Sequence, residues 1–245
     1  MLLGYSVNLK IGQIILFESN RYFVLNKPPA MHSVMRANNP KGDSIAKLLL
    51  DYNPIFTEAA PKPIDGGLVN RLDFETSGVM IAAKDRRSWS DFKDFEKEGV
   101  FLKTYLALVE GSFPDGRAQL EHFLGSRYRR SSRVIVIEGD RPPPKRFVRV
   151  SCEVLAIKPL QFGGRSLTVV EVKIERGARH QIRAQLAASG HPLAGDLLYG
   201  AKFSLNQLGI YYPARFVLHG FCFSCARDLE GLPKNLTAPV PEILR

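Results

Sequence analysis

The sequence has three cysteines, one tryptophan and no long apolar run. Its longest unbroken apolar stretches, Val79 to Ala83 and Tyr105 to Val109, hold five residues each, whereas a membrane helix needs about 20. The first residues lack a charged segment followed by an apolar core, so no secretion signal is expected. An odd number of cysteines cannot form a complete disulfide framework and fits a reducing compartment. We therefore expect a cytoplasmic protein with no membrane segment.

Short motifs that mark the commonest cofactor and metal sites are also missing. The sequence holds no GxGxxG, GxxxxGK[ST], HExxH or GxSxG pattern, and its five histidines show no metal-ligand spacing. Cys222 and Cys225 form a CxxC pair, but Cys152 is the only other cysteine, so a zinc site would need a ligand such as His219. Small buried side chains are the simpler interpretation of these cysteines. We expect no cofactor and no metal.

What the chain does have is an ordinary globular composition with a strong positive charge. Its 245 residues are 45% hydrophobic and 24% charged, which fits one large domain or two small ones. No change in composition marks a boundary, so we expect a single domain over residues 1–245. The 34 Lys and Arg against 24 Asp and Glu give a net charge of +10, which attracts polyanions such as nucleic acid. A basic surface without a specific partner is the alternative.

The positive charge is concentrated in residues 127–149. This segment holds eight Lys and Arg against Glu138 and Asp140, and therefore six of the ten net positive charges. Tyr128 and Phe147 lie among the arginines; guanidinium groups pair with phosphates and aromatic rings stack on bases. No helical spacing suggests a membrane-surface helix. We expect a nucleic-acid-binding arm, although its three prolines also fit a solvated loop. The candidate contacts are Arg127, Arg129 and Arg130.

The hydrophobic pattern predicts more strands than helices. Two strands are expected within residues 14–26, and others at 79–83, 103–110, 134–137, 147–157, 167–174 and 216–223. Helices are expected from Asp43 or Ser44 to about Asp51, from Asp85 to Gly99, and from Gln181 to Ser189. Residues 53–66 are expected to be loop. Because strands and helices do not alternate regularly, the pattern favours an α+β fold with a mixed or largely antiparallel sheet.

The first segment that carries chemistry runs from Asn70 to Gly78 and leads into the apolar stretch at Val79. Arg71 and Asp73 are two residues apart and can face the same side, and a carboxylate is a potential nucleophile or base. The hydroxyls that follow can bind nearby backbone groups in a turn. A tight connection in which Asp73 only caps the turn is the alternative.

The second segment, Glu175 to Arg183, lies between a predicted strand and a predicted helix. A helix start presents free N–H groups and the positive end of the helix dipole, which suits an anion. Three arginines within eight residues at this place indicate phosphate or carboxylate binding. A salt-bridged surface turn explains the same residues equally well.

Both segments belong to a set of five ordered motifs. Asn70 to Lys84, NRLDFETSGVMIAAK, resembles the HRLDxxTSGLLLxAK motif of RluA-type RNA pseudouridine synthases. Gly177 to Gly200 is similar to GRxHQIRxHLxxxGxPIxGDxxYG of the same family. The shorter matches are Leu25 to Ala30 with vNKPxG, Lys103 to Gly111 with KxYxAlVxG, and Leu218 to Gly220 with LHA. The resemblance covers about residues 14–245, and its two long motifs are highly specific.

The resemblance implies one α+β catalytic domain with a long mixed sheet crossed by an RNA-binding cleft. It also implies isomerisation of uridine to pseudouridine within RNA, without cofactor or metal. By motif position, Asp73 corresponds to the catalytic aspartate, Tyr105 to the tyrosine that stacks on the target base, and Arg183 to the arginine that pairs with the aspartate. Arg71 corresponds to the arginine that fills the space left by the flipped nucleotide. Two further candidate contacts to the substrate are Arg179 and Ile182.

The reaction asks for these residue types. A carboxylate can add covalently or remove a proton, and a neighbouring guanidinium keeps it ionised where burial alone would raise its pKa. Turning a nucleotide out of its stack costs a few kcal/mol, which a receiving ring and a gap-filling arginine help to offset. Tyr105 is also a candidate base for the proton on uracil C5, although a tyrosine pKa of about 10 favours the stacking role.

Four residues depart from the family motifs: Asn70 for His, Ala30 for Gly, Ala178 for Arg and Gln185 for His. The residues of the proposed catalytic trio are unchanged. These departures bear on which RNA is recognised. The N-terminal RNA-binding domain of some relatives is not expected here, so a monomeric catalytic domain would hold tRNA or rRNA itself. A non-catalytic RNA-binding relative is the alternative function. A glycoside hydrolase is a third, but Asp73 and Glu75 are close in sequence for flanking a sugar.

Overall fold

The strands of the protein form one long mixed sheet. The computed structural model describes residues 9–35, 43–114, 116–126, 128, 131–139 and 144–245. Within them the strand order is β1-β2-β3-β9-β4-β8-β7-β5-β6, with β10 also paired to β9. Strands β3 and β9 run parallel, and the other described neighbours run antiparallel. The strands are β1 (Ile15–Glu18), β2 (Tyr22–Lys27), β3 (Ser77–Ala83), β4 (Phe101–Glu110), β5 (Arg117–Gly125), β6 (Ile135–Ile137), β7 (Val148–Phe162), β8 (Arg165–Ile174), β9 (Leu218–Cys225) and β10 (Asn235–Thr237).

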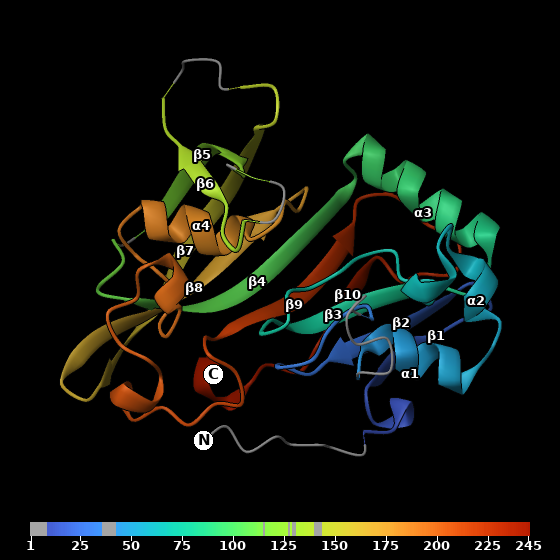
Figure 1. Ribbon diagram of the computed structural model, residues 1–245, viewed down its shortest axis with the longest axis horizontal. Helices are drawn as coiled ribbons and strands as arrows, with labels where there is room; N and C mark the ends of the chain where they lie inside the picture. The colour runs from blue at the N-terminus through green and yellow to red at the C-terminus, as the bar shows by residue number, and fades with distance from the viewer. Residues whose placement is uncertain (1–8, 36–42, 115, 127, 129–130, 140–143) are drawn as a thin grey trace.

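The helices are grouped at the two ends of this sheet (Figure 1). They are α1 (Ile45–Tyr52), α2 (Phe56–Ala59), α3 (Arg86–Glu98) and α4 (Gln181–Ala188). Short 3-10 turns cover Ile11–Gln13, Pro63–Asp65, Leu197–Tyr199, Asn206–Leu208 and Glu242–Leu244. Helices α1 to α3 lie around β1, β2 and β3, whereas α4 lies beside β5 and β6. The predicted α+β class is confirmed. Among the described helices, none is long and apolar enough to span a bilayer.

Helices α1 and α3 start at the polar residues that the sequence indicates. The Ser44 hydroxyl accepts a hydrogen bond from the Lys47 N–H at 3.1 Å at the start of α1. The Asp85 carboxylate accepts one from the Ser88 N–H at 2.8 Å at the start of α3. These bonds satisfy amide groups that a helix start leaves unpaired. Helix α3 ends at Gly99, whose left-handed φ of 73° suits glycine.

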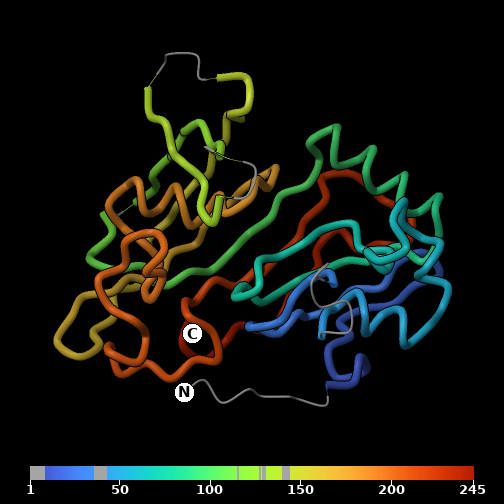
Figure 2. Tube along the Cα trace, in the orientation of Figure 1, coloured from blue at the N-terminus to red at the C-terminus, as the bar shows by residue number. Residues whose placement is uncertain are grey.

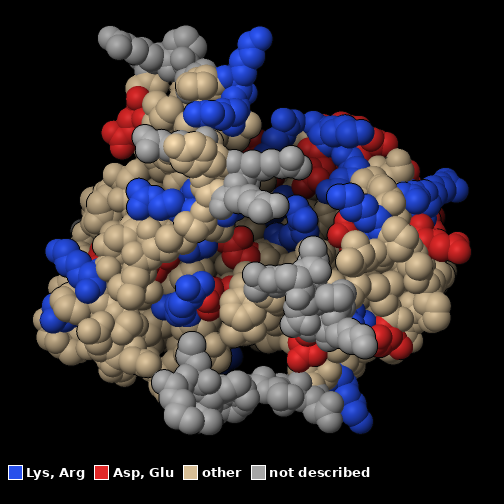
Figure 3. Space-filling model, in the orientation of Figure 1, with Lys and Arg blue, Asp and Glu red and all other residues tan. Residues whose placement is uncertain are grey.

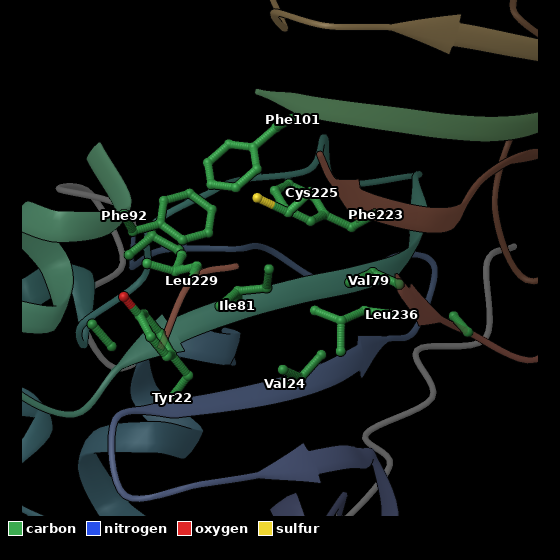
Figure 4. Packing of buried hydrophobic residues seen from close by; sticks show 13 residues of the cluster. Tyr22, Val24, Val79, Ile81, Phe92, Phe101, Phe223, Cys225, Leu229 and Leu236 are labelled. Carbon is green, nitrogen blue, oxygen red and sulfur yellow. The ribbon is translucent and has the colours of Figure 1, made fainter. Parts of the chain in front are cut away.

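Each end of the sheet has its own hydrophobic core. Between α3 and the sheet, the rings of Phe92 and Phe101 lie 4.6 Å apart and those of Phe101 and Phe223 lie 4.8 Å apart (Figure 4). The core at the other end contains Ile182 and Leu186 of α4, and Tyr105 packs against it from β4. Strands β4 and β9 connect the two ends, as the chain trace in Figure 2 shows. The middle of the sheet therefore lies between two packed hydrophobic cores.

Two glycines bring β3 and β9 close together at this middle point. Gly78 has a φ of 118°, and a Cβ there would overlap the backbone of Gly220. Gly220 is in turn paired with Tyr105 across β9 and β4. A side chain at position 78 would push these strands apart. The glycine of the sequence motif is therefore needed to place the start of β3, and the residues just before it, beside Tyr105.

Four segments differ from the prediction. Residues 53–66, expected as loop, contain α2 and the 3-10 turn Pro63–Asp65, while β5 and β10 were not predicted at all. Strand β7 continues to Phe162, past the predicted end at 157. Its Pro159 pairs with Thr168 of β8, but β5 reaches only as far as Leu155 on the other side. Proline is tolerated there because that side of β7 is a sheet edge, where no partner needs its missing N–H.

Candidate active site

Asp73 lies in a short turn just before β3. Its carbonyl oxygen accepts a hydrogen bond from the Thr76 N–H at 3.1 Å, which closes the turn. One residue earlier, the Ser33 hydroxyl donates to the Leu72 carbonyl at 2.6 Å and accepts from the Leu72 N–H at 3.0 Å. The backbone on both sides of the carboxylate is thus fixed, while the Asp73 side chain stays 33% exposed. A fixed carboxylate with access to solvent can meet a substrate.

Asn70, which stands where the family motif has His, forms hydrogen bonds with the backbone of β3 just after this turn. Its side-chain oxygen accepts a hydrogen bond from the Ile81 N–H at 2.8 Å, and its amide nitrogen donates to the Val79 carbonyl at 3.3 Å. Both partners are backbone groups of β3. This departure from the motif therefore serves the local backbone and leaves the Asp73 side chain free for other contacts.

Lys27 is a fully buried lysine behind the same turn. Its ammonium group donates to the carbonyls of Pro28 at 2.8 Å and Phe74 at 3.1 Å. Burial lowers the pKa of Lys27 to about 7, and the charges of Asp73 and Glu75 partly oppose that shift. The lysine of the NKPP motif thus ties the end of β2 to the residue that follows Asp73.

Glu75 faces a different partner from Asp73. It is 5% exposed, accepts a hydrogen bond from the Arg215 N–H at 3.0 Å and forms an ion pair with the Arg215 side chain. Asp73 instead lies toward α4. The two carboxylates are therefore held by separate cations, and they do not form the facing pair that a glycoside hydrolase uses.

Tyr105 points into the site from β4, opposite Gly220 of β9. A Cβ on Gly220 would lie 3.5 Å from the edge of the Tyr105 ring, so the two are in van der Waals range. Burial raises the pKa of Tyr105 above its ordinary value, and the negative charge of Asp73 raises it further. The phenol therefore stays protonated at neutral pH and offers its ring and an O–H group.

Arg183 enters the site from α4 and is 5% exposed. Its Nε and Nη2 donate to the two carboxylate oxygens of Asp196 at 2.7 and 3.0 Å, and its Nη1 lies 3.4 Å from Oδ2 of Asp73. The guanidinium carbon lies 4.9 Å from the centre of the Tyr199 ring and 4.5 Å from that of Phe216. Planar contacts with the rings and the two-point ion pair hold the guanidinium in one orientation.

His180 begins α4 and lies between Asp73 and Tyr199. Its Nε2 is 3.9 Å from Oδ2 of Asp73, and its Nδ1 is 2.8 Å from the Tyr199 hydroxyl. Asp73, Tyr105, Arg183 and His180 therefore meet at one place, although they come from three distant parts of the sequence.

The other sequence-predicted contacts lie around this centre or outside the described residues. Arg71 is exposed, and no described residue forms a hydrogen bond or ion pair with it. Ile182 is 4% exposed and belongs to the core against which Tyr105 packs. Arg179 donates from one nitrogen to the carbonyls of Ser131 and Ser132 at 2.8 and 3.1 Å. The predicted contacts that fall outside the described residues are Arg127, Arg129 and Arg130.

A cavity of about 450 Å³ lies beside Arg179, between the end of β5, the chain that follows β5 and the residues just before α4. Its walls are Leu124, Gly125, Ser126, Tyr128, Val134, Arg146, Val148, Ala178 and Arg179. The Tyr128 side chain is 71% exposed there. Apolar walls, two arginines and an exposed aromatic ring are features that suit a nucleotide.

Sequence reasoning missed four residues that shape this centre: Lys27, His180, Asp196 and Tyr199. Each stands in a motif quoted for the family resemblance, so the signal was present. Their partners are the backbone of the turn, another side chain of the site, or both, and such pairings depend on the three-dimensional arrangement. In the described residues, no three His, Cys, Asp or Glu side chains gather as metal ligands.

Known proteins resemble this fold and this sequence over most of the chain. Residues 21–188 match the RNA pseudouridylate synthase family. An uncharacterised RNA pseudouridine synthase of Bacillus subtilis, YjbO, is 30% identical over 231 residues, which are 93% of this chain and 72% of that protein. Ribosomal large subunit pseudouridine synthase D of Xylella fastidiosa is 29% identical over 240 residues, 94% of this chain and 66% of that protein.

Solved structures show the same fold. The human RNA pseudouridylate synthase domain containing 1 protein superposes with a TM-score of 0.71 at 24% identity, over 95% of this chain and 86% of that one. The fold and the relatives define an RNA-modifying isomerase. The chain belongs to the RluA-type RNA pseudouridine synthases.

Proposed function

We propose that this chain converts particular uridines of structured tRNA or rRNA to pseudouridine, with Asp73 as the catalytic carboxylate. The observation that carries the proposal is the pairing of Asp73 with Arg183, whose Nη1 lies 3.4 Å from Oδ2 of Asp73. A guanidinium at this distance favours the ionised carboxylate in a partly buried site. The pair stands at the motif positions where the family has its aspartate and arginine.

The reaction needs no outside reactant. The C1′–N1 bond of uridine breaks, a C1′–C5 bond forms, and the hydrogen lost from C5 is balanced by one gained at N1. Asp73 serves the first step by adding to the sugar or by removing a proton from it, and it is regenerated when the base rejoins. Arg183 keeps Asp73 ionised and in place throughout, since an arginine does not lose its charge.

Tyr105 and Arg71 have supporting roles in this proposal. The ring of Tyr105 receives the rotated base beside Asp73. Its raised pKa disfavours the phenolate, so stacking is the better-supported role and removal of the C5 proton the less supported one. Arg71 is exposed two residues before Asp73 and fills the gap that the flipped nucleotide leaves in the RNA. Target extrusion costs a few kcal/mol, which these two contacts offset.

In this proposal, positively charged side chains on one face of the protein hold the RNA. Figure 3 shows Lys and Arg side chains over the β5–β6 end, along α3 and in the centre between them. Arg179 and the basic residues of 127–149 complete the proposed contact surface, and Ile182 supports the ring of Tyr105 from the core. In this proposal the protein acts as a monomer in the cytoplasm. Two relatives from Xylella and Neisseria are named for the large ribosomal subunit, so large-subunit rRNA is the first substrate to test.

Comparing Asp73→Asn with the parent protein tests the proposal. Total RNA from cells with and without the gene is mapped for pseudouridine, and the RNA so identified is then modified in vitro. Asp73→Asn keeps the shape but removes the anion, so turnover disappears while RNA affinity stays within about tenfold, because phosphate contacts supply most of it. Asp94→Asn, on exposed α3, is the matched control and keeps full turnover.

Two results would overturn the proposal. Turnover by Asp73→Asn shows that another group carries out the chemistry. A parent protein that binds RNA tightly but forms no pseudouridine in any RNA supports the alternative, a non-catalytic RNA-binding relative or chaperone that uses the same surface.

A further inference from the structure

A chain of contacts runs from the backbone before β6 to the Asp73 carboxylate. The Val134 N–H donates to the Tyr199 hydroxyl oxygen at 2.9 Å. The same hydroxyl lies 2.8 Å from Nδ1 of His180, and Nε2 of His180 lies 3.9 Å from Oδ2 of Asp73. The side chain of His180 is 13% exposed, so few water molecules compete for these contacts.

The Val134 contact sets a preference among the other hydrogen bonds. A backbone N–H can only donate, so the Tyr199 oxygen is the acceptor in that bond. The Tyr199 hydroxyl keeps its own proton to donate, and Nδ1 of His180, at 2.8 Å, is placed to accept it. A neutral imidazole then carries its single proton on the other nitrogen. This arrangement favours the tautomer with the proton on Nε2, the nitrogen that faces Asp73.

The surroundings keep His180 in its neutral form. The groups that face it are Asp73, Arg183, Arg179, Asp196 and Tyr199. Burial lowers the pKa of His180 most, the two arginines lower it further, and the two carboxylates oppose them. At neutral pH the ring is therefore a neutral donor toward Asp73 rather than a second cation beside Arg183.

The backbone at His180 is held in a conformation that few side chains adopt. Its φ is 53°, and in the described part of the chain only Ala30 shares a positive φ among the non-glycine residues. The His180 carbonyl accepts a hydrogen bond from the Ala184 N–H at 2.9 Å in the first turn of α4. Strained residues of this kind persist where the surroundings fix them, and they are common at functional sites.

We propose that His180, oriented by Tyr199, is a positioning residue that directs its Nε2–H at Oδ2 of Asp73. In the described residues the contacts of Asp73 with Arg183 and with His180 both reach this one oxygen. Holding Oδ2 leaves Oδ1 to react. At 3.9 Å the donor is beyond hydrogen-bond distance, so this role requires a shift of about 1 Å when RNA binds. The inference rests on the proposed catalytic role of Asp73.

Two substitutions at one position separate this role from a structural one. Gln places an amide N–H near the place of Nε2, whereas Asn places its amide near Nδ1. His180→Gln is expected to keep kcat within about threefold, and His180→Asn to lose about 10- to 100-fold in kcat with an unchanged KM for RNA, since a misplaced reacting group costs that much. A purely structural role gives the opposite order, because Asn tolerates a positive φ better than Gln. That opposite order would overturn the proposal.

A second measurement reads the protonation of His180 in the parent protein without turnover. In the parent protein labelled with ¹⁵N-histidine, the nitrogen shifts and long-range proton couplings report which ring nitrogen carries the proton. His180, identified by the signal lost in His180→Gln, is expected to be neutral and protonated at Nε2 at pH 7.5. Tyr199→Phe keeps the ring beside Arg183 but removes the hydroxyl, and kcat falls about tenfold or more.

The outcomes distinguish the two proposals. A His180 ring protonated at Nδ1, or full kcat in Tyr199→Phe, ends the positioning role while an inactive Asp73→Asn still supports the catalytic carboxylate. An active Asp73→Asn ends both.

Discussion

Arg183 donates two hydrogen bonds to the Asp196 carboxylate, at 2.7 and 3.0 Å, and both residues are almost fully buried. The pair has the two-point geometry that only a planar guanidinium offers a carboxylate. It uses Nε and Nη2 and leaves Nη1 for Asp73 at 3.4 Å. Asp196 thus fixes the arginine, and the arginine reaches Asp73, the proposed catalytic carboxylate, with its remaining donor.

Arg183→Lys is expected to be nearly as damaging as Arg183→Met. A lysine is a point charge and cannot bond both oxygens of Asp196 while also reaching Asp73. Both variants should lose at least about 100-fold in kcat/KM. In Arg183→Met the buried Asp196 is left unpaired, which costs about 3–5 kcal/mol of unfolding free energy. Turnover assays and denaturant melts measure these effects, and parent-like turnover in the Lys variant would show that net charge alone is needed.

Tyr105→Phe separates stacking from proton removal. The ring survives the change and the hydroxyl does not. Because burial and Asp73 raise the pKa of Tyr105, we expect near-normal pseudouridine formation, within about tenfold of the parent. Quenched time courses that follow both uridine loss and pseudouridine release give the answer. Loss of uridine without release of pseudouridine would make the hydroxyl the base for the C5 proton.

The fold class and the turn that carries Asp73 could be predicted because local sequence patterns specify them. Helix α3 has its cap at Asp85, and the alternation in β8 sets its faces. The segment from Asn70 to Gly78, which contains Asp73, precedes an apolar strand that stands out in the sequence. Strand β5 alternates between exposed and more buried residues, but its inward positions include Ala118 and His122, so its hydrophobic pattern is weak. It gains its structure from pairing with β7.

The supporting contacts of the site could not be predicted for a related reason. Asp196 is 13 positions from Arg183, and Val134 is 65 positions from Tyr199. No local pattern specifies such pairs, because the turns between them decide which atoms meet. The resemblance could place residues in motifs, but only coordinates assign Asp196 to Arg183 and Tyr199 to His180.

Lys27 gives the stability of the protein a pH dependence above neutrality. Its pKa is about 7 in the folded protein, below the ordinary value of 10.5. Between these values the unfolded chain binds more protons, so the unfolding free energy rises with pH. The slope approaches at most about 1.4 kcal/mol per pH unit for one proton. The effect comes from burial, because a charged lysine is penalised inside the protein.

Lys27→Met removes this titration. Denaturant melts of parent and variant at pH values from 7.5 to 9 measure the difference between their unfolding free energies, which should grow with pH in favour of the parent. Cys152, whose pKa burial raises to about 12, is present in both proteins, so its titration cancels in this difference. A constant difference across the range would show that Lys27 stays charged in the folded protein, with a pKa near its ordinary value.

The basic segment 127–149 is expected to hold RNA without taking part in the chemistry. Replacing Arg127, Arg129, Arg130 and Arg133 by Gln should weaken RNA binding, and each lost phosphate contact should lower the log–log salt slope by about 0.7 to 0.9. Turnover should fall at low RNA concentration and recover at saturation, since these residues are not expected to touch the reacting base.

A charge-matched variant separates contact from net charge. Replacing the exposed Lys10, Lys62, Lys202 and Lys234 by Gln removes the same number of charges from residues outside the segment and outside α3. If the segment binds phosphates, this control keeps the parent slope while the arm variant does not. If both variants lower the slope equally, overall charge attracts the RNA and the segment has no special role. If the arm variant and the parent give parallel salt plots, the segment is a solvated loop, and RNA is held by residues nearer Asp73.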